Sequence, residues 1–573
     1  MPIQSKRWQI SPPLPSAEAS RFYEFHPVVA NILFNRGFSD PASAKAFLEG
    51  RLLADDPFKM KGMSQAVGRL RQAIKKQELI IVYGDFDADG VTSTTLLVSA
   101  LLALGANVKP YIPHRVDEGY GLNAEALQKL ARDGAKVVVT VDCGIRSLTE
   151  VNVGKSCGLD MIVTDHHSVG PEVPSALAVI NPKQPGCTYP EKMLAGVGIA
   201  FKVAEALFKV AAQQDKRELP LKVEDLLDLV AIGTVADLAP MNHAENRSLV
   251  TRGLKHLQRA SRPGIRALLE VSAVQPQNVT AATIGFALGP RLNAAGRLES
   301  AMIAYELLST HDIDLAMQRA GELQKLNEKR QQLTREAQAH ARTLAKVDGT
   351  DGKELPLIFA IDPAFQEGIV GLVAGRLTEE YYRPAIVMHQ GSGESHGSCR
   401  SIAEFNITEA LDQCADLLIR HGGHAQAAGF AIYNENLPVF REKMLDIASR
   451  SLHDKDLRPT LQIDAELALH HVDIPLHEAL GALEPCGQEN TAPLLCTRRL
   501  RVVDCRTVGK DNSHLKLRVS DGSREQDGIA FRLGHLAQDM PRYVDLAYQV
   551  DVDEWNGSRR LQLIVQDVRE ATD

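Results

Sequence analysis

Three aspartates at alternate positions, Asp85, Asp87 and Asp89, give this sequence its clearest chemical signal. They follow a run of apolar and aromatic residues, Leu79–Tyr83, which predicts a buried β-strand. In extended backbone, residues two apart lie on one face, so the three carboxylates would point the same way. Carboxylates this close repel one another, and a metal cation would neutralise them. Taken alone, the loop also fits a solvated acidic turn.

Further acidic groups follow the same pattern, in which an apolar run ends in an acid. Asp142 ends the strand predicted in KVVVTVDCGI, and Asp165, His166 and His167 end the one in DMIVTDHHSVG. Asp237 closes the apolar stretch DLVAIGTVADLAP, whose pattern favours a helix over a strand. One acid after a strand is common, but a series of them along one sheet is not expected of solvated loops.

Strands and helices alternate between residues 79 and 238, which predicts an α/β fold with a doubly wound, mostly parallel sheet. Binding sites in such sheets lie beyond the carboxyl ends of the strands, where the acidic groups stand. The helix after the three aspartates would have Leu96–Leu104 as its apolar body, with Thr92 and Ser93 available as caps.

The pattern along the chain divides it into five segments. They are a polar lead-in (1–58), the first α/β domain (59–310), a long connecting helix (311–349), a second α/β domain (350–457) and a segment of short strands (458–573). Asp521-Gly522 and Asn556-Gly557 are hairpin signals in the last segment, which predict a small β-barrel of the OB type. Such barrels commonly bind single-stranded nucleic acid.

Three glycine-bearing or small-residue segments could contact phosphate groups. GPRLNAAGRLES predicts a loop, GESHGSCRSI predicts a turn, and HGGHAQAAGF has paired glycines that let backbone approach a ligand. The alternative is that the first is a helix cap with exposed arginines and that the others only turn the chain. Their candidate residues are Arg291, Asn293, Arg297, Ser398, Arg400, Ser401, Gly423, His424 and Gln426.

Composition excludes several classes of protein. The net charge of −8 argues against a uniformly basic nucleic-acid binder, although a local basic track suffices for binding. The eight cysteines form no CxxC pair, so we expect a reduced, cytoplasmic protein without structural zinc. We also expect no signal peptide and no membrane span, because no run approaches about 18 apolar residues.

Together, the segments GDFDADG, VDCG, TDHH, GTVADLAP, RLNAAGR and GGHAQAAGF resemble the motifs of the DHH phosphoesterase superfamily. Within it, the set is similar to the bacterial single-stranded-DNA exonucleases, from about residue 50 through the barrel. The resemblance implies a DHH catalytic domain, a DHHA1 second domain and an OB-like barrel. It also implies a processive 5′-to-3′ exonuclease that degrades single-stranded DNA to mononucleotides in DNA repair and recombination.

The resemblance further implies two divalent cations, Mn²⁺ or Mg²⁺, and a role for each acidic residue. Asp85 and Asp87 would hold one cation, although related sites often have histidine in the part of the motif where Asp85 stands. The other cation would be held by Asp89, His166 and Asp237, with Asp142 bridging the two. Carboxylates and imidazole suit Mn²⁺ on their own chemistry.

Two residues of the superfamily motif would act beside the cations. Asp165 would orient its histidine neighbours. His167 would lie near the scissile phosphate, where it would orient the phosphate or protonate the leaving oxygen. The alternative is that His167 is a further metal ligand.

The resemblance implies that a phosphate pocket opposite the cations recognises the 5′ end. Arg291, Asn293 and Arg297 would hold the strand near the cations, and the pocket would be lined by Arg115, Ser398, Arg400, Ser401, Gly423, His424 and Gln426. The expected partners of this monomeric protein are single-stranded DNA, the single-stranded DNA-binding protein and a helicase. There are two alternatives: a phosphodiesterase for short oligonucleotides or dinucleotides, and a scaffold protein without activity. The scaffold is disfavoured, because every acidic residue expected to hold a cation is present in the sequence.

Overall fold

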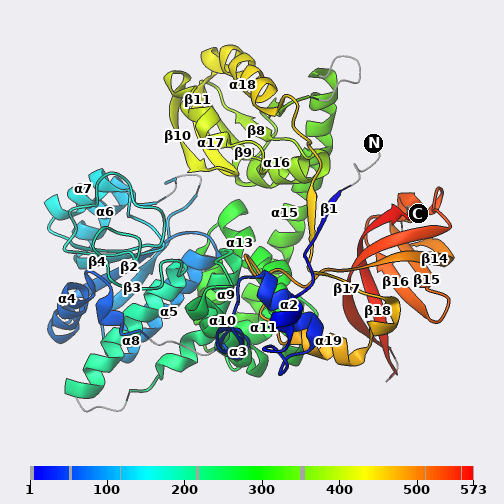
Figure 1. Ribbon diagram of the computed structural model, residues 1–573. Coiled ribbons are helices and arrows are strands. Elements are labelled where there is room, and N and C mark those ends of the chain that lie inside the picture. Colours follow the sequence, from blue (N-terminus) through cyan, green and yellow to red (C-terminus); the bar gives the residue numbers. More distant parts are fainter. Residues whose placement is uncertain are drawn as a thin grey trace. The chain divides into compact units, whose positions relative to one another are not determined.

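The computed structural model describes residues 6–50, 55–115, 118–119, 121–214, 219–348, 355–509, 511–555 and 558–571 (Figure 1). The chain forms two compact units. The larger unit comprises Leu53–Ala239 and Leu249–Leu457, and the smaller comprises Met1–Leu52, Pro240–Ser248 and Arg458–Asp573. Among the described residues, no helix is both long and apolar enough to cross a membrane.

A parallel sheet of five strands forms the first layer of the larger unit, as the sequence predicts. Its order is β3-β2-β4-β5-β6, and every neighbouring pair is parallel. The strands are β2 (Leu79–Gly84), β3 (Val108–Tyr111), β4 (Ala135–Val141), β5 (Asp160–Thr164) and β6 (Ala178–Ile180). Two groups of helices pack on this sheet, and the helices within each group contact one another. One group is α4 (Met63–Lys76), α5 (Ala88–Ala103) and α8 (Gly196–Gln214); the other is α6 (Ala124–Arg132) and α7 (Leu148–Ser156).

The start of α5 differs from the predicted extended loop. Asp87 caps the helix, because its Oδ1 accepts the backbone N–H groups of Asp89 and Gly90, both at 3.0 Å. Asp89 therefore lies in the first helical turn, and Thr92 and Ser93 are buried inside the helix instead of capping it. The short carboxylate of Asp87 is the better N-cap, and it stands just before the helix.

Helices continue the larger unit after the sheet. They are α9 (Leu227–Ala236), α10 (Ala244–Arg259), α11 (Pro263–Val271), α13 (Gly289–Leu298), α14 (Met302–Ser309) and the long α15 (Ile313–Asp348); residues 244–248 of α10 belong to the smaller unit. The segment before Asp237 is thus a helix, as predicted, whereas the predicted loop of Arg291, Asn293 and Arg297 is the helix α13. Its glycine serves close packing: a Cβ at Gly296 would lie 2.2 Å from the carbonyl oxygen of Phe86.

The second α/β domain belongs to the same unit and contains a five-stranded sheet of order β10-β11-β9-β8-β7. Only β7–β8 is parallel. The elements are β7 (Ile358–Asp362), α16 (Glu367–Tyr381), β8 (Ala385–Gln390), β9 (Glu394–Arg400), α17 (Ile407–Asp412), β10 (Leu418–His424), β11 (Ala427–Tyr433) and α18 (Leu437–Leu452).

Two predicted turns of this domain are largely strand. Ser398 and Arg400 lie on β9, and Gly423 and His424 end β10, just before the connection that contains Gln426. The glycines allow side chains to pack across the sheet instead of turning the chain. A Cβ at Gly397 would lie 2.4 Å from the ring of Phe430, so this strand position must lack a side chain.

The smaller unit contains the predicted barrel. Its strands are β13 (Ala465–Glu466), β14 (Leu495–Val508), β15 (His514–Ser520), β16 (Glu525–Ala530), β17 (Tyr543–Trp555) and β18 (Ser558–Glu570). Pairing of β14 with β17 closes the sheet. Asp521-Gly522 connects β15 to β16, while Asn556-Gly557 lies outside the described residues.

The N-terminal segment shares the hydrophobic core of the barrel. The strand β1 (Arg7–Ile10) pairs with β12 (Thr460–Ile463). The helices α2 (Pro27–Asn35) and α3 (Pro41–Glu49) contribute Ile32, Leu33 and Phe47 to the cluster that contains Leu517 and Val565 of the barrel.

Candidate active site

Acidic residues and histidines meet at the carboxyl edge of the first sheet. Their ligand atoms form three groups, each with all atoms within 4.8 Å of one another: Asp85, Asp87 and Asp142; Asp89, His166 and Asp237; and Asp142, His166 and His167. The structure thus brings together every residue expected to hold a cation. Asp142 and His166 each belong to two groups, so the groups adjoin.

Asp89 is oriented by the N-terminus of α8. Its Oδ2 accepts the N–H of Gly196 at 2.7 Å, and its Oδ1 accepts the N–H of Val197 at 2.8 Å. Burial, and next the charge of Asp87, raise the pKa of Asp89 to about 7, although the two N–H groups oppose this rise. The carboxylate is therefore held rigidly in a place where its charge needs a cation.

Asp142 stands in strained backbone, with φ at +63°. A left-handed conformation is uncommon outside glycine and turns the side chain of this residue toward the cluster. Its Oδ1 lies 3.1 Å from Nε2 of His166.

Three buried polar atoms at the centre of the cluster form no hydrogen bond within the described residues: Asp85 Oδ1, Asp142 Oδ1 and His166 Nε2, although the last two lie 3.1 Å apart. Buried polar atoms are rarely left without partners. Carboxylate oxygens and imidazole nitrogens are the ligands that Mn²⁺ accepts, and Mg²⁺ prefers carboxylates. The residues present therefore fit divalent cations.

The electrostatics of the cluster support the same conclusion. Burial raises the pKa of Asp85 and of Asp142 well above the usual range, and neighbouring carboxylates add to the rise. Burial, followed by Asp89 and Asp87, raises the pKa of Asp237 to about 9. Burial lowers the pKa of His166 to about 3, so this imidazole is neutral and offers a lone pair. Without cations, the carboxylates must therefore retain protons.

His167 is held by Asp165, as expected of an orienting carboxylate. Oδ1 of Asp165 lies 2.7 Å from Nδ1 of His167 and also accepts its backbone N–H at 3.0 Å. Burial opposes the charge on His167, but the bond to Asp165 prevails and raises the pKa of the imidazole. The other oxygen of Asp165, Oδ2, accepts the backbone N–H of Ile145 at 2.9 Å, which fixes the carboxylate in turn.

Other residues that hold the cluster do not stand out in the sequence. Nδ2 of Asn181 donates to the carbonyl of His167 at 3.0 Å, and Nζ of Lys183 donates to the carbonyl of His166 at 2.6 Å. Gly233 is required by packing, because a Cβ there would lie 2.8 Å from Oδ1 of Asp89. The only feature of the sequence that pointed to Asn181 and Lys183 is that they are polar residues directly after β6.

The three residues of α13 have different roles in the structure. Oδ1 of Asn293 accepts the N–H of Ala88 at 2.7 Å, which supports the aspartate loop. Nη1 of Arg297 donates to the carbonyl of Gly368 at 3.0 Å. Nε of Arg291 donates to Oε1 of Gln324 on α15 at 2.8 Å.

Several arginine side chains lie beside the acidic cluster. Cζ of Arg115 lies 4.7 Å from the centre of the Phe86 ring. Burial, helped by the charges of Arg115 and Arg400 among others and opposed by Asp87, lowers the pKa of Arg297 to about 10. Arg115 and Arg400 therefore each lie within electrostatic range of Arg297, and Arg115 also lies within range of Asp85 and Asp87.

The other pocket candidates lie on the second domain. Oγ of Ser398 accepts from Nη1 of Arg400 at 3.3 Å. Ser401 is buried and its hydroxyl donates to the carbonyl of Phe405 at 2.6 Å, so that hydroxyl is already used within the fold. Gly423, His424 and Gln426 are exposed.

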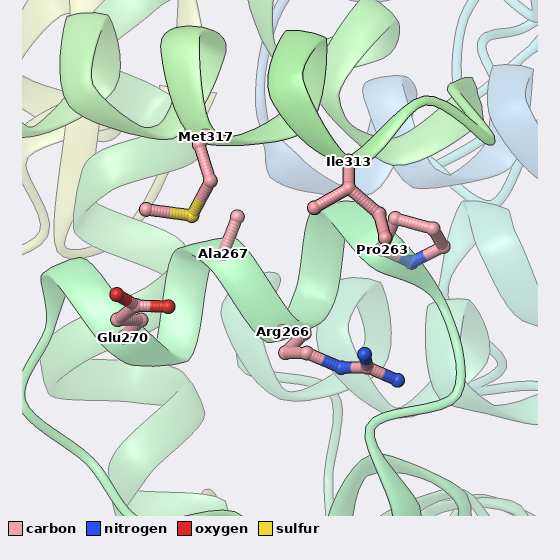
Figure 2. A pocket seen from close by; sticks show the side chains of 6 residues that line it. All are labelled: Pro263, Arg266, Ala267, Glu270, Ile313 and Met317. Atoms are coloured by element: carbon pink, nitrogen blue, oxygen red, sulfur yellow. The ribbon is translucent and has the colours of Figure 1, made fainter.

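A pocket elsewhere in the larger unit lacks comparable chemistry. Figure 2 shows Ile313 and Met317 of α15 facing Pro263 and Ala267 of α11, and the side chains of Arg266 and Glu270 complete the lining. This is an apolar gap between two helices, and it contains none of the acidic residues of the cluster.

Three family models match the chain. They are "DHH family, N-terminal domain" over residues 79–234, "DHHA1 domain" over residues 355–450 and "RecJ OB domain" over residues 463–567.

Known proteins are similar along nearly the whole chain. The "Single-stranded-DNA-specific exonuclease RecJ" of Bacillus subtilis is 38% identical over 569 residues, which is 98% of this chain and 70% of the relative. The crystal structure of RecJ from Thermus thermophilus with Mn²⁺ matches with a TM-score of 0.84 and 32% identity, covering 99% of this chain and 80% of that one. Its structure with Mg²⁺ gives a TM-score of 0.79 and 30% identity, covering 99% and 79%.

Proposed function

The chain belongs to the RecJ family of single-stranded-DNA-specific exonucleases, and from this premise we propose how it acts. It is a metal-dependent exonuclease that degrades single-stranded DNA from the 5′ end, processively, to mononucleotides. The observation that carries the proposal is the set of unpartnered atoms on Asp85, Asp142 and His166, within the described residues, at the meeting point of three ligand groups.

The cofactors are divalent cations, Mn²⁺ or Mg²⁺, as bound by the similar solved structures. Two such cations, when bound, supply an activated water and stabilise the attacking and leaving oxygens of a phosphodiester. In our proposal, one would be held by Asp85 and Asp87 and the other by Asp89, His166 and Asp237. Asp142 could serve both, since its carboxylate adjoins both sets of atoms.

We assign to His167 a role on the substrate. Asp165 fixes the ring through Nδ1 and raises its pKa, so Nε2 carries the proton that the leaving oxygen needs. The alternative role as a ligand has support in the group of Asp142, His166 and His167. Replacing His167 with Asn separates the two: unchanged Mn²⁺ affinity with lost turnover favours the acid.

The end of the strand is recognised by cationic and polar groups opposite the cations. Arg115 and Arg400 donate to the terminal 5′-phosphate, and Arg297 holds the next phosphate near the cations. The remaining lining is proposed to come from Ser398, Ser401, Gly423, His424 and Gln426. Ser401 would shape the pocket without donating its hydroxyl to the phosphate, because that hydroxyl donates to the carbonyl of Phe405.

The proposed setting follows from this activity. The protein acts as a monomer in the bacterial cytoplasm, in DNA repair and recombination, on strands that a helicase exposes and that single-stranded DNA-binding protein covers. The OB-like barrel of the smaller unit contributes strand binding, since this fold commonly binds single strands.

A digestion of end-labelled strands tests the proposal. With Mn²⁺, a 5′-labelled single strand should release labelled mononucleotide first, while a 3′-labelled strand should release its label only when a molecule has been digested to its end. A chelator should stop both reactions, and a dinucleotide should be cleaved more slowly than a long strand. Gradual shortening of the 5′-labelled strand would contradict the polarity, and preferred cleavage of the dinucleotide would favour a small-molecule phosphodiesterase.

A further inference from the structure

The connecting helix α15 has a buried face that turns polar at its centre. Its first half contacts α11, α13 and α14, and its second half contacts α16 and β7 (Figure 1). Six buried positions recur every three or four residues, or at multiples of that spacing, which is one side of a helix: Ala316, Ala320, Leu323, Asn327, Thr334 and Ala341; buried Leu326 lies beside Asn327. Asn327 is 3% exposed and Thr334 is 1% exposed, in the middle of a face that is otherwise apolar.

Arg330 stands between these two residues and has few partners. Its Nη2 donates to Oδ1 of Asn327 at 2.8 Å. Its Nε is buried without a hydrogen-bond partner, and no carboxylate forms an ion pair with Arg330 among the residues described. Arg330 is part-buried, and a guanidinium with an unpaired donor and no counter-charge is costly, so this group is open to an anionic ligand.

Two further arginines approach α15 on either side of Arg330. Arg291 of α13 bonds to Gln324, and Nη1 of Arg376 of α16 lies 3.5 Å from Oε1 of Gln338. Burial lowers the pKa of Arg330, and the charges of Arg376 and Arg291 lower it further. The distance along the helix from Gln324 to Gln338, 14 residue steps, is roughly 21 Å, a length that suits several phosphates of one strand.

The positive charges of Arg291, Arg330 and Arg376 form a row that continues toward the acidic cluster. Arg330 is among the charges that lower the pKa of Arg297, together with Arg115 and Arg400. Carboxylates offset part of this charge, since Asp87 acts on Arg297 and Glu328 acts on Arg291. An added anion would offset the repulsion that remains at Arg330. The anion that this row suits is a chain of phosphates leading away from the cations.

We propose that Arg330, flanked by Arg291 and Arg376, binds the sugar–phosphate backbone of the single strand on the side away from its 5′ end. This inference rests on the proposed function and adds to it a phosphate site on the connecting helix. The guanidinium fork gives two hydrogen bonds to one phosphate, which a lysine cannot reproduce. Asn327 holds the fork in place through its bond to Nη2.

The test compares Arg330→Met with Arg335→Met, which removes the same charge from an exposed position of the same helix. Binding of a 5′-phosphorylated, fluorescent 20-nucleotide strand is measured with a chelator present, from 50 to 200 mM salt. We expect Arg330→Met to weaken binding about tenfold or more, since it loses a charge-assisted contact. The slope of log affinity against log salt should fall by about 0.7. Arg335→Met should bind like the wild type.

Thermal unfolding separates this role from a structural one. Because Arg330 has no carboxylate counter-charge among the described residues, Arg330→Met should melt at or above the wild-type temperature, and Arg330→Lys should keep the salt slope while it loses affinity. Unchanged affinity and slope in Arg330→Met, with a lowered melting temperature, would overturn the inference and make Arg330 structural. Failure of the wild type itself to bind or cleave single strands would instead overturn the proposed function, and this inference with it.

Discussion

Gly196 leaves the space that Asp142 occupies: a Cβ at this glycine would lie 2.7 Å from Cβ of Asp142 and 2.8 Å from its Oδ1. The backbone N–H of Gly196 also donates to Asp89 at 2.7 Å. One residue at the start of α8 therefore positions two carboxylates, one from the group of each proposed cation.

Replacing Gly196 with Ala should displace Asp142 without removing any ligand. We expect turnover to fall about 10²-fold, because a misplacement of about 1 Å is costly in an active site. Mn²⁺-dependent cleavage of a single strand measures this effect. Gly321→Ala is the control, since a Cβ at Gly321 meets nothing within 4 Å. Wild-type turnover in Gly196→Ala would mean that the position of Asp142 matters little.

Binding of Mn²⁺ should depend on pH. Asp89 and Asp237, with pKa values of about 7 and about 9, hold protons at neutral pH that a cation must displace. The affinity for Mn²⁺ should therefore rise from about pH 6 to pH 8, with release of protons. Calorimetry in buffers of different ionisation enthalpy counts these protons. An affinity that is constant over this range would contradict the raised pKa values.

The same shifts predict the stability of the metal-free protein. The native state retains protons that the unfolded chain loses near its usual carboxyl pKa of about 4. Stability without metal should therefore fall as pH rises from about 4 toward 9, and Mn²⁺ should restore it. Urea unfolding with a chelator, at several pH values, measures this slope; a slope of opposite sign would contradict the assignment of the raised pKa values.

Arg247 should be essential for the stability of the smaller unit. Its side chain is 1% exposed, stacks 3.8 Å from the centre of the Phe47 ring and has no carboxylate partner among the described residues. It donates to the carbonyls of Phe47, Ala482, Leu483, Glu484 and Pro485. Arg247→Met leaves these oxygens without that donor, so we expect a loss of about 3–5 kcal/mol in the free energy of unfolding.

Chemical unfolding of Arg247→Met measures this loss, and Arg252→Met on the same helix is the control. Arg252 is partly exposed and lies 4.0 Å from Glu224, so its removal should change stability by less than about 0.5 kcal/mol. Equal stability of the two variants would show that Arg247 is not needed.

Arg400 should set the preference for a phosphorylated end. It forms hydrogen bonds to Ser398 and to the carbonyl of Cys399, but no ion pair with a carboxylate in the described part of the chain. Arg400→Gln should lower the rate on 5′-phosphorylated strands about tenfold and leave the rate on 5′-hydroxyl strands nearly unchanged. Arg420→Gln, at an exposed position of β10, is the control. An equal loss on both substrates would place Arg400 outside end recognition.

Much of the fold could be predicted because strand patterns and acids recur together. A parallel sheet puts its carboxyl ends on one edge, so acids that end β2, β4 and β5 had to meet there. The barrel and the helix before Asp237 could be predicted for the same reason: both follow from local patterns of apolar residues and turn signals. The predicted loop at α13 was wrong, because Gly296 is required by contact with Phe86, which no local pattern reveals.

The site was predictable only where chemistry is local. Carboxylates and histidines could be named from their types, but the residues that hold them could not. Gly196, Val197 and Lys183 act through contacts with backbone groups or carboxylates that meet only in space. Ser401 looked like a phosphate donor by type, whereas its hydroxyl bonds to Phe405 four residues later.

The number of Mn²⁺ ions bound per chain is the sharpest check on the proposed metal centre. By calorimetry, we predict two ions in the wild type and one in Asp237→Asn, which keeps Asp85, Asp87 and Asp142 but loses a ligand of the other group. Asp225→Asn is the control and should bind two ions, because Asp225 lies outside the cluster and accepts the N–H of Lys222. One ion or none in the wild type would contradict the two-cation site.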